Sequence, residues 1–269
     1  MIAVIAGTGS LPAEACRRLL ATHKDFFVVT LFPENNEWEL RQVVSGKAEL
    51  IAQALYKPGD ILQLLKEKLT THVLFIGKVD KSNLLKHLKF DWLALKLMGS
   101  LATRGDRDVM EALLAELASH GIHTMRQDEV LDGLLVKPGI LCGTVTSLLE
   151  TDITLGINTA IAISEADIGQ TVIVKNGMVI AVEAIEGTDA CISRGLALAG
   201  DGIVICKAAH RLHNTRFDLP TLGPASVERF TPGQVLAVAW LASHTLIAQR
   251  EQFVAQALQR GIALAAVEE

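Results

Sequence analysis

Short apolar runs alternate with segments of helical periodicity along the first half of the chain. The predicted strands lie at 1–7, 26–32, 48–55, 71–79 and after Gly121. The predicted helices lie at 11–22, 59–70 and 104–120. Within 59–70, Leu62, Leu65 and Leu69 fall on one face, and Lys66 and Lys68 fall off it. Because strands and helices alternate, we expect an α/β fold that begins with a Rossmann-like parallel sheet covered by helices.

The second half has a mixed pattern. Segment 152–169 predicts a helix, 202–208 predicts a buried strand, and 245–268 predicts a strand, a helix and a strand in turn. Two apolar runs flank Asn176-Gly177, and this dipeptide is a strong indication of a two-residue hairpin. We therefore expect a mixed α/β region with an antiparallel element.

The change of pattern divides the chain into three regions. Residues 133–150 hold three glycines and a proline without a clean period, so we assign them to a linker. We expect a Rossmann-like N-terminal domain at 1–132 and a mixed α/β catalytic domain at 151–269. The substrate cleft is expected between these two domains.

Composition and charge narrow the possible functions. Half of the 269 residues are hydrophobic, only 4% are aromatic, and the net charge is −5. The negative charge and the scarcity of aromatic rings argue against nucleic-acid binding. The longest apolar run, 235–242, is far shorter than the ~20 residues of a spanning helix, and the first ten residues do not resemble a signal peptide. None of the four cysteines forms a C-x-x-C pair, which predicts reduced thiols in a cytoplasmic protein.

A glycine-rich turn follows the first predicted strand and opens a helix, so it is a candidate for binding phosphate at the helix N-terminus. Its candidate contacts to phosphate or sugar are Gly7, Thr8, Gly9, Ser10 and Leu11. Pro12 stands where the dinucleotide fingerprint needs a third glycine, and Glu34 is only a rough candidate for the acidic partner of a ribose. A nucleotide-dependent oxidoreductase and a purely structural turn both stay open. Lys78 leaves another strand on what should be the same sheet edge, either as a phosphate contact or as a solvated lysine.

Two polar loops in the second half carry the candidate chemistry. Asp189 comes at a predicted helix start, where it caps the helix or acts in catalysis. Lys207 ends a buried strand, either as a phosphate contact or with its amine extended to solvent. Asp218 lies between apolar residues and follows Arg216, so it is a candidate for binding a metal or activating water, or for a salt bridge with Arg216. His210 and His213 are three residues apart, but no third metal ligand is indicated.

Several motifs occur in a fixed order along nearly the whole chain. They are IAGTGSLP at 5–12, DWLALKL at 91–97, GDRDV at 105–109, VIAVEAIEGTDA at 179–190, RFDLPTLGP at 216–224 and the tail at 245–254. This ordered set resembles the LpxI family of UDP-2,3-diacylglucosamine pyrophosphatases. The resemblance implies a hydrolase of lipid A biosynthesis that releases UMP and 2,3-diacylglucosamine 1-phosphate.

The resemblance also implies roles for particular residues. Asp218 matches the critical aspartate of the family, with Asp189 and Arg216 as further catalytic residues. Mg²⁺ is the expected cofactor, with Asp218, Asp189 and Asn214 as expected ligands, because Mg²⁺ prefers oxygen. Beyond the glycine-rich turn, the expected substrate contacts are Lys78, Thr188, Lys207 and Thr221. The substrate is a lipid-linked nucleotide sugar, so attachment to the inner-membrane surface is expected, and a homodimer is compatible with this interpretation.

One segment departs from the family pattern, which is similar to K-x-x-K-P-x-Q-D-x-R-x-D. Lys207, Arg216 and Asp218 are kept, whereas His210, Arg211, His213 and Asn214 replace the lysine, proline, glutamine and aspartate between them. Asn214 still offers an oxygen to Mg²⁺ but lacks the negative charge. A divergent active enzyme, an enzyme with altered metal use or specificity, and a non-catalytic lipid- or nucleotide-sugar-binding protein all stay open.

Overall fold

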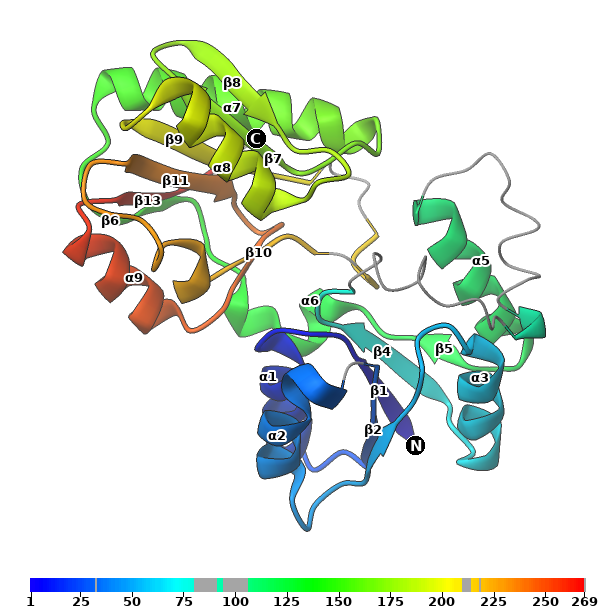
Figure 1. Cartoon of the computed structure of the whole chain (residues 1–269). Coiled ribbons are helices and arrows are strands. Elements are labelled where there is room, and N and C mark those ends of the chain that lie inside the picture. Colours follow the sequence, from blue (N-terminus) through cyan, green and yellow to red (C-terminus); the bar gives the residue numbers. More distant parts are fainter. Residues whose placement is uncertain (32, 80–90, 94–105, 210–213, 218, 269) are drawn as a thin grey trace. The chain divides into compact units, whose positions relative to one another are not determined.

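The computed structural model describes residues 1–31, 33–79, 91–93, 106–209, 214–217 and 219–268 (Figure 1). The chain folds as two compact units. The N-terminal unit contains the described residues of Met1–Asp132 together with 214–217. The C-terminal unit contains those of Gly133–His213 and Leu219–Glu269.

The N-terminal unit is built on a parallel five-stranded sheet. Its strands are β1 (Ile2–Ala6), β2 (Phe26–Thr30), β3 (Leu50–Ala52), β4 (His72–Ile76) and β5 (His123–Thr124). Their spatial order is β3-β2-β1-β4-β5, and every neighbouring pair is parallel. This order is that of a Rossmann fold, and the predicted Rossmann-like sheet is therefore confirmed. The order reverses between β1 and β4, so their carboxyl ends are neighbours.

Helices cover both faces of this sheet. They are α1 (Leu11–Ala21), α2 (Pro33–Val44), α3 (Pro58–Glu67), α5 (Asp106–Ser119) and the short α6 (Gln127–Val130). Side chains of β1 alternate between the faces: Ala3 and Ile5 join a buried cluster with Leu62 and Leu65 of α3 and Leu117 of α5. Figure 1 shows α1 and α2 on the opposite face from α3.

One detail of the helix prediction is wrong. Leu69 does not continue the apolar face of α3, because the helix ends at Glu67 and Leu69 is 81% exposed. Leu69 has a φ of 51°, in the left-handed region, and its N–H donates to the carbonyl of Lys66. This conformation turns the chain into β4 and moves the side chain away from the core.

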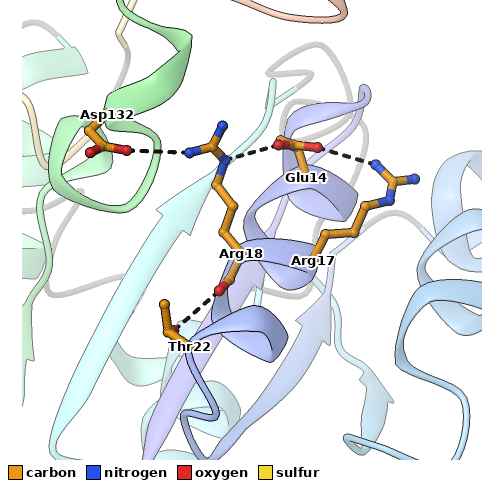
Figure 2. Close-up of polar contacts among 5 residues, drawn as sticks. All are labelled: Glu14, Arg17, Arg18, Thr22 and Asp132. Carbon is orange, nitrogen blue, oxygen red and sulfur yellow. Dashed lines mark hydrogen bonds and ion pairs between the residues drawn. The ribbon is translucent and has the colours of Figure 1, made fainter.

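Ion pairs connect helix α1 to Asp132, the last residue before the chain enters the C-terminal unit. Figure 2 shows Arg18 between two carboxylates: Nε donates to Glu14 at 2.9 Å, and Nη1 donates to Asp132 at 3.3 Å. Arg17 contacts Glu14 from its other side at 3.5 Å. These pairs lie at the surface, where each contributes at most about 1 kcal/mol. The apolar side of α1, from Leu11 to Leu19, is buried and supplies most of its attachment.

The C-terminal unit has a mixed six-stranded sheet. Its strands, in spatial order, are β6 (Gly139–Cys142), β13 (Ala263–Val267), β11 (Val235–Leu241), β9 (Ile203–Lys207), β7 (Thr171–Lys175) and β8 (Met178–Val182). Strands β13, β11 and β9 are parallel, and β6, β7 and β8 are each antiparallel to an inner neighbour. The predicted mixed α/β fold is confirmed. A small parallel ladder joins β10 (Thr221–Leu222) and β12 (Leu246–Ile247).

Three helices enclose this sheet. They are α7 (Ser147–Glu165), α8 (Thr188–Ala199) and α9 (Arg250–Gln259), and a short 3₁₀ turn lies at Pro224–Ser226. Ile153 and Ile157 of α7 pack with Val174 of β7 on one face. On the other face, Ile192 of α8 and Phe253 of α9 belong to a cluster around Trp240. The unit is thus a three-layer sandwich (Figure 1).

The predicted hairpin is present at Asn176-Gly177. Both residues have positive φ, 50° and 73°, as the two-residue turn requires. The carboxylate of Asp152 in α7, only 3% exposed, accepts the N–H groups of Asn176 at 2.9 Å and Gly177 at 2.6 Å. The turn is therefore fixed to the helix behind it.

Two segments differ from the expected division of the chain. Residues 133–150, expected as a linker, contain β6, which pairs with β13 as an edge strand of the C-terminal sheet. Residues 214–217, expected in the C-terminal domain, belong to the N-terminal unit. A local pattern could not show either result, since both depend on partners about a hundred residues away.

All four cysteines are free thiols, as predicted. Burial raises the pKa of Cys16 to about 12 and that of Cys191 to about 11, so these thiols are poor nucleophiles at neutral pH. Among the described helices, none combines the length and the apolar character needed to cross a bilayer.

Candidate active site

The glycine-rich turn at the end of β1 meets the end of β4. Thr8 and Lys78 form an antiparallel bridge, with N–H to O distances of 2.8 and 2.9 Å, and the Gly7 N–H donates to the carbonyl of Ile76 at 2.8 Å. A side chain at Gly7 would place its Cβ 2.5 Å from the Lys78 carbonyl oxygen. Gly7 is therefore needed for this close approach of two backbones, whichever ligand binds nearby.

This bridge limits which groups of the turn can bind phosphate. The Gly7 N–H donates to Ile76 of β4, the Thr8 N–H donates to Lys78 just after β4, and the Thr8 hydroxyl donates to the Lys78 carbonyl at 3.1 Å. The next residues, Gly9 and Ser10, lead into α1 and precede its first helical residue, Leu11. We expect an anion at this helix to contact the backbone from Gly9 onward rather than at Gly7 or Thr8.

Segment 214–217 carries Arg216 and is bound to the N-terminal unit. The Gln127 N–H, at the start of α6, donates to the carbonyl of Thr215 at 2.7 Å. The Arg216 N–H and Nε both donate to the Asn214 side-chain oxygen, at 3.0 and 2.9 Å. The Asn214 amide nitrogen in turn donates to Glu111 of α5 at 2.6 Å. Backbone and side-chain hydrogen bonds therefore hold Arg216 in one direction.

In the C-terminal unit, Lys207 ends β9 and is only 9% exposed. Its ammonium group donates to the hydroxyl of Thr188 at 2.9 Å and to that of Thr171 at 3.4 Å. The Thr188 hydroxyl donates to the carboxylate of Glu183 at 2.9 Å. The alternative of an amine extended to solvent is therefore wrong for Lys207.

Hydrogen-bond chemistry fixes the direction of this chain of contacts. An ammonium group only donates, so the Thr188 hydroxyl must accept from Lys207 and give its own proton to an acceptor. Glu183 is held in place to receive it, because its N–H donates to the Thr171 carbonyl at 2.8 Å. The carboxylate thus reaches Lys207 through a hydroxyl, and the third ammonium hydrogen remains for another acceptor.

The two ends of α8 show why Lys207 is unusual. At the C-terminal end, Lys175 donates to the carbonyls of Ala199 and Asp201, both at 2.7 Å, where the helix dipole favours a cation. At the N-terminal end, Lys207 contacts Thr188, the first helical residue, where the dipole disfavours a cation. A buried ammonium group and a helix N-terminus are both positive, so together they favour the binding of a phosphate group.

Asp189, in the first turn of α8, does not cap the helix. Its side chain is 73% exposed and pairs with Arg229 at 3.0 Å, while Gly187 occupies the N-cap position. The Thr221 hydroxyl, another predicted substrate contact, donates to the Leu219 carbonyl at 3.1 Å.

The described residues do not supply a complete magnesium site. Within the ranges that the structure describes, no three His, Cys, Asp or Glu side chains gather as metal ligands. The oxygens of Asp189 and Asn214 contact the guanidinium groups of Arg229 and Arg216. Asp218, His210 and His213 lie outside the described residues.

Glu111, Glu183 and Thr171 are contacts that sequence reasoning missed. Glu111 falls on a predicted helix surface, and Thr171 begins a strand, so neither stands out by pattern. Glu183 could have been found, since it lies five residues before Thr188 in the motif already chosen for its chemistry.

Comparison with known proteins covers both units. Residues 1–134 match the LpxI N-terminal domain, and residues 137–265 match the LpxI C-terminal domain. The UDP-2,3-diacylglucosamine pyrophosphatase LpxI of Caulobacter vibrioides is 30% identical over 97% of this chain and 95% of its own. A UDP-glucose-4-epimerase from Stenotrophomonas maltophila is similar over 45% of this chain and 34% of its own, with 18% identity. Its TM-score of 0.31 supports no conclusion.

Proposed function

The chain belongs to the LpxI family, and from this premise we propose that it hydrolyses UDP-2,3-diacylglucosamine to UMP and 2,3-diacylglucosamine 1-phosphate in lipid A biosynthesis. Water adds to the α-phosphorus, the bond from that phosphorus to the bridging oxygen breaks, and 2,3-diacylglucosamine 1-phosphate leaves. The similarity to the Caulobacter enzyme across both units supports this choice of substrate.

The geometric observation that carries the proposal is the buried ammonium group of Lys207 beside the N-terminus of α8. A pyrophosphate diester is doubly negative, and fixed positive groups stabilise the charge that develops in its transition state. Lys207 has a hydrogen free to meet a phosphoryl oxygen, while Thr188 and Glu183 hold the ammonium group in place. In the N-terminal unit, Arg216 is a separate candidate for binding a substrate phosphate; its side chain is 41% exposed and its direction is set by Asn214.

The proposal also includes Asp218 as the group that orients the water, and a need for Mg²⁺. Both come from the family resemblance. The described residues do not form a complete metal site by themselves. The substrate carries two acyl chains, so we also propose that the protein works at the cytoplasmic surface of the inner membrane, as a homodimer.

The test is UMP release from UDP-2,3-diacylglucosamine, measured with Mg²⁺ and with EDTA. We expect release only with Mg²⁺, and we expect Asp218→Ala to abolish it without changing the melting temperature. Asp25→Ala, which removes an exposed carboxylate ahead of β2, is the matched control and should keep the wild-type rate. Wild-type rates in Asp218→Ala would exclude Asp218 from the mechanism.

A second candidate is a binding protein without turnover. The observation that favours it is the Asn214 oxygen, which is already used by Arg216 at the position where an aspartate was expected. Binding of 2,3-diacylglucosamine 1-phosphate without any UMP release would support this candidate.

A further inference from the structure

Asn214 lies between an acidic and a basic side chain, all within the N-terminal unit. Its amide nitrogen donates to Glu111 Oε1 at 2.6 Å, and its oxygen accepts from Arg216 Nε at 2.9 Å and from the Arg216 N–H at 3.0 Å. Glu111 can only accept at neutral pH, and both Arg216 groups can only donate. A single orientation of the amide satisfies these partners, because exchanging its oxygen and nitrogen would break all three bonds.

We propose that Asn214 is a positioning residue that joins Arg216 to Glu111 of α5, and that this link works only while position 111 or 214 carries an amide. The inference deepens the proposed hydrolase function and rests on it, because Arg216 is there the cation that receives phosphate. It assigns to Asn214 a role different from that of a magnesium ligand.

The surrounding contacts explain why this link controls Arg216. The backbone is already fixed, since Thr215 accepts from the Gln127 N–H at 2.7 Å and the Phe217 N–H donates to the Asn214 carbonyl at 3.2 Å. The direction of the guanidinium group then depends on the Asn214 side chain. Arg216 Nη2 lies 3.7 Å from Glu111 Oε2, beyond hydrogen-bond distance, so it remains available to a phosphoryl oxygen.

An aspartate at position 214 would break the link to α5. Its second carboxylate oxygen would take the place of the amide nitrogen and face Glu111 without a shared proton. Two like charges at this distance repel, so the segment would shift away from α5 and carry Arg216 with it. Glu111→Gln in the same protein would restore a donor, now on α5, facing an acceptor at position 214.

Four proteins test the proposal: wild type, Asn214→Asp, Glu111→Gln and the double variant, each measured for UMP release at saturating Mg²⁺. We expect Asn214→Asp to raise KM about tenfold, in line with the loss of one hydrogen bond to a charged group, and to change kcat little. We expect Glu111→Gln to raise KM only about twofold, because it keeps a hydrogen bond to Asn214 and loses a weak ion pair. The double variant should return to within about twofold of wild type. Asn158→Asp, on the exposed side of α7, adds the same charge as a control and should leave KM unchanged.

Two results would overturn the proposal. One is an Asn214→Asp enzyme with unchanged KM and a lower Mg²⁺ requirement, which would make position 214 a metal ligand. The other is a double variant no better than Asn214→Asp. If the wild type releases no UMP, the hydrolase function fails, but melting temperatures still test the link between Asn214 and Glu111. The link then requires that Asn214→Asp melts at a lower temperature than wild type and that the double variant regains the wild-type melting temperature.

Discussion

Replacing Lys207 by methionine tests whether this lysine binds a phosphate group or stabilises the fold. Methionine has a similar length and no charge, so Lys207→Met removes the ammonium group without leaving a cavity. The matched control is Lys175→Met, because Lys175 also ends a strand, β7, and lies at the opposite end of α8. The two residues differ in their partners: Lys207 contacts hydroxyls, and Lys175 contacts helix-terminal carbonyls.

The expected magnitudes follow from these contacts. Lys207→Met loses two hydrogen bonds from a charged donor, about 1.5–3 kcal/mol each, but it also avoids several kcal/mol of desolvation for a buried cation. These terms oppose each other, so we expect the free energy of unfolding to change by less than about 1 kcal/mol. Lys175→Met loses two bonds of 2.7 Å at a partly exposed site and its interaction with the helix dipole, so we expect a loss of about 1–2 kcal/mol.

The effect on catalysis should be the reverse. Loss of a buried cation from a phosphate site costs about 3 kcal/mol, so kcat/KM for UMP release should fall about 100-fold in Lys207→Met. Lys175→Met should keep the wild-type kcat/KM. Chemical denaturation and initial rates on the same preparations provide both quantities. A Lys207→Met protein that loses more than about 3 kcal/mol of stability, or one that keeps its activity, would refute the assignment of Lys207 as a phosphate group's partner.

Two further predictions concern stability alone. Asp152→Ala should cost about 2–3 kcal/mol in chemical denaturation, because the N–H groups of Asn176 and Gly177 lose their buried acceptor; a loss below about 0.5 kcal/mol would contradict this. The hydrogen bond from Arg126 holds the pKa of Asp128 below its usual range. This pair therefore stabilises the fold fully above the unfolded pKa of about 3.9. The stabilisation is lost as the pH falls through the lower pKa of the folded state. Arg126→Ala should therefore weaken the acid dependence of the melting temperature below about pH 4, and an unaltered dependence would count against the pair.

The sheets were predictable because their signals are local. Short apolar runs that alternate with helical segments predict a parallel sheet, and Asn176-Gly177 supplies the two left-handed residues of a hairpin within one dipeptide. The end of α3 was not predictable in this way, because Leu69 adopts a left-handed conformation that its residue type does not indicate. Strand β6 was missed because its partner, β13, comes about 120 residues later.

The candidate site was only partly predictable for a similar reason. Lys207 and Thr188 were chosen from motifs, and the structure brings them together. Pattern could not show that Glu111 meets Asn214, since a carboxylate on a helix surface looks the same with or without a distant partner. It also could not show that the Thr8 N–H already donates to the carbonyl of Lys78, just after β4.

The assignment of residues 214–217 to the N-terminal unit has a consequence for synthesis. A ribosome completes β1–β5 of the first sheet well before it reaches Thr215, so the acceptor of the Gln127 N–H is not yet made when that sheet can first assemble. A fragment that stops at Asp132 would contain every strand of the sheet and still lack this bond and the partner of Glu111. The N-terminal unit is thus completed only when most of the other unit has left the ribosome, and the two halves cannot be exchanged between relatives by a single cut in the chain.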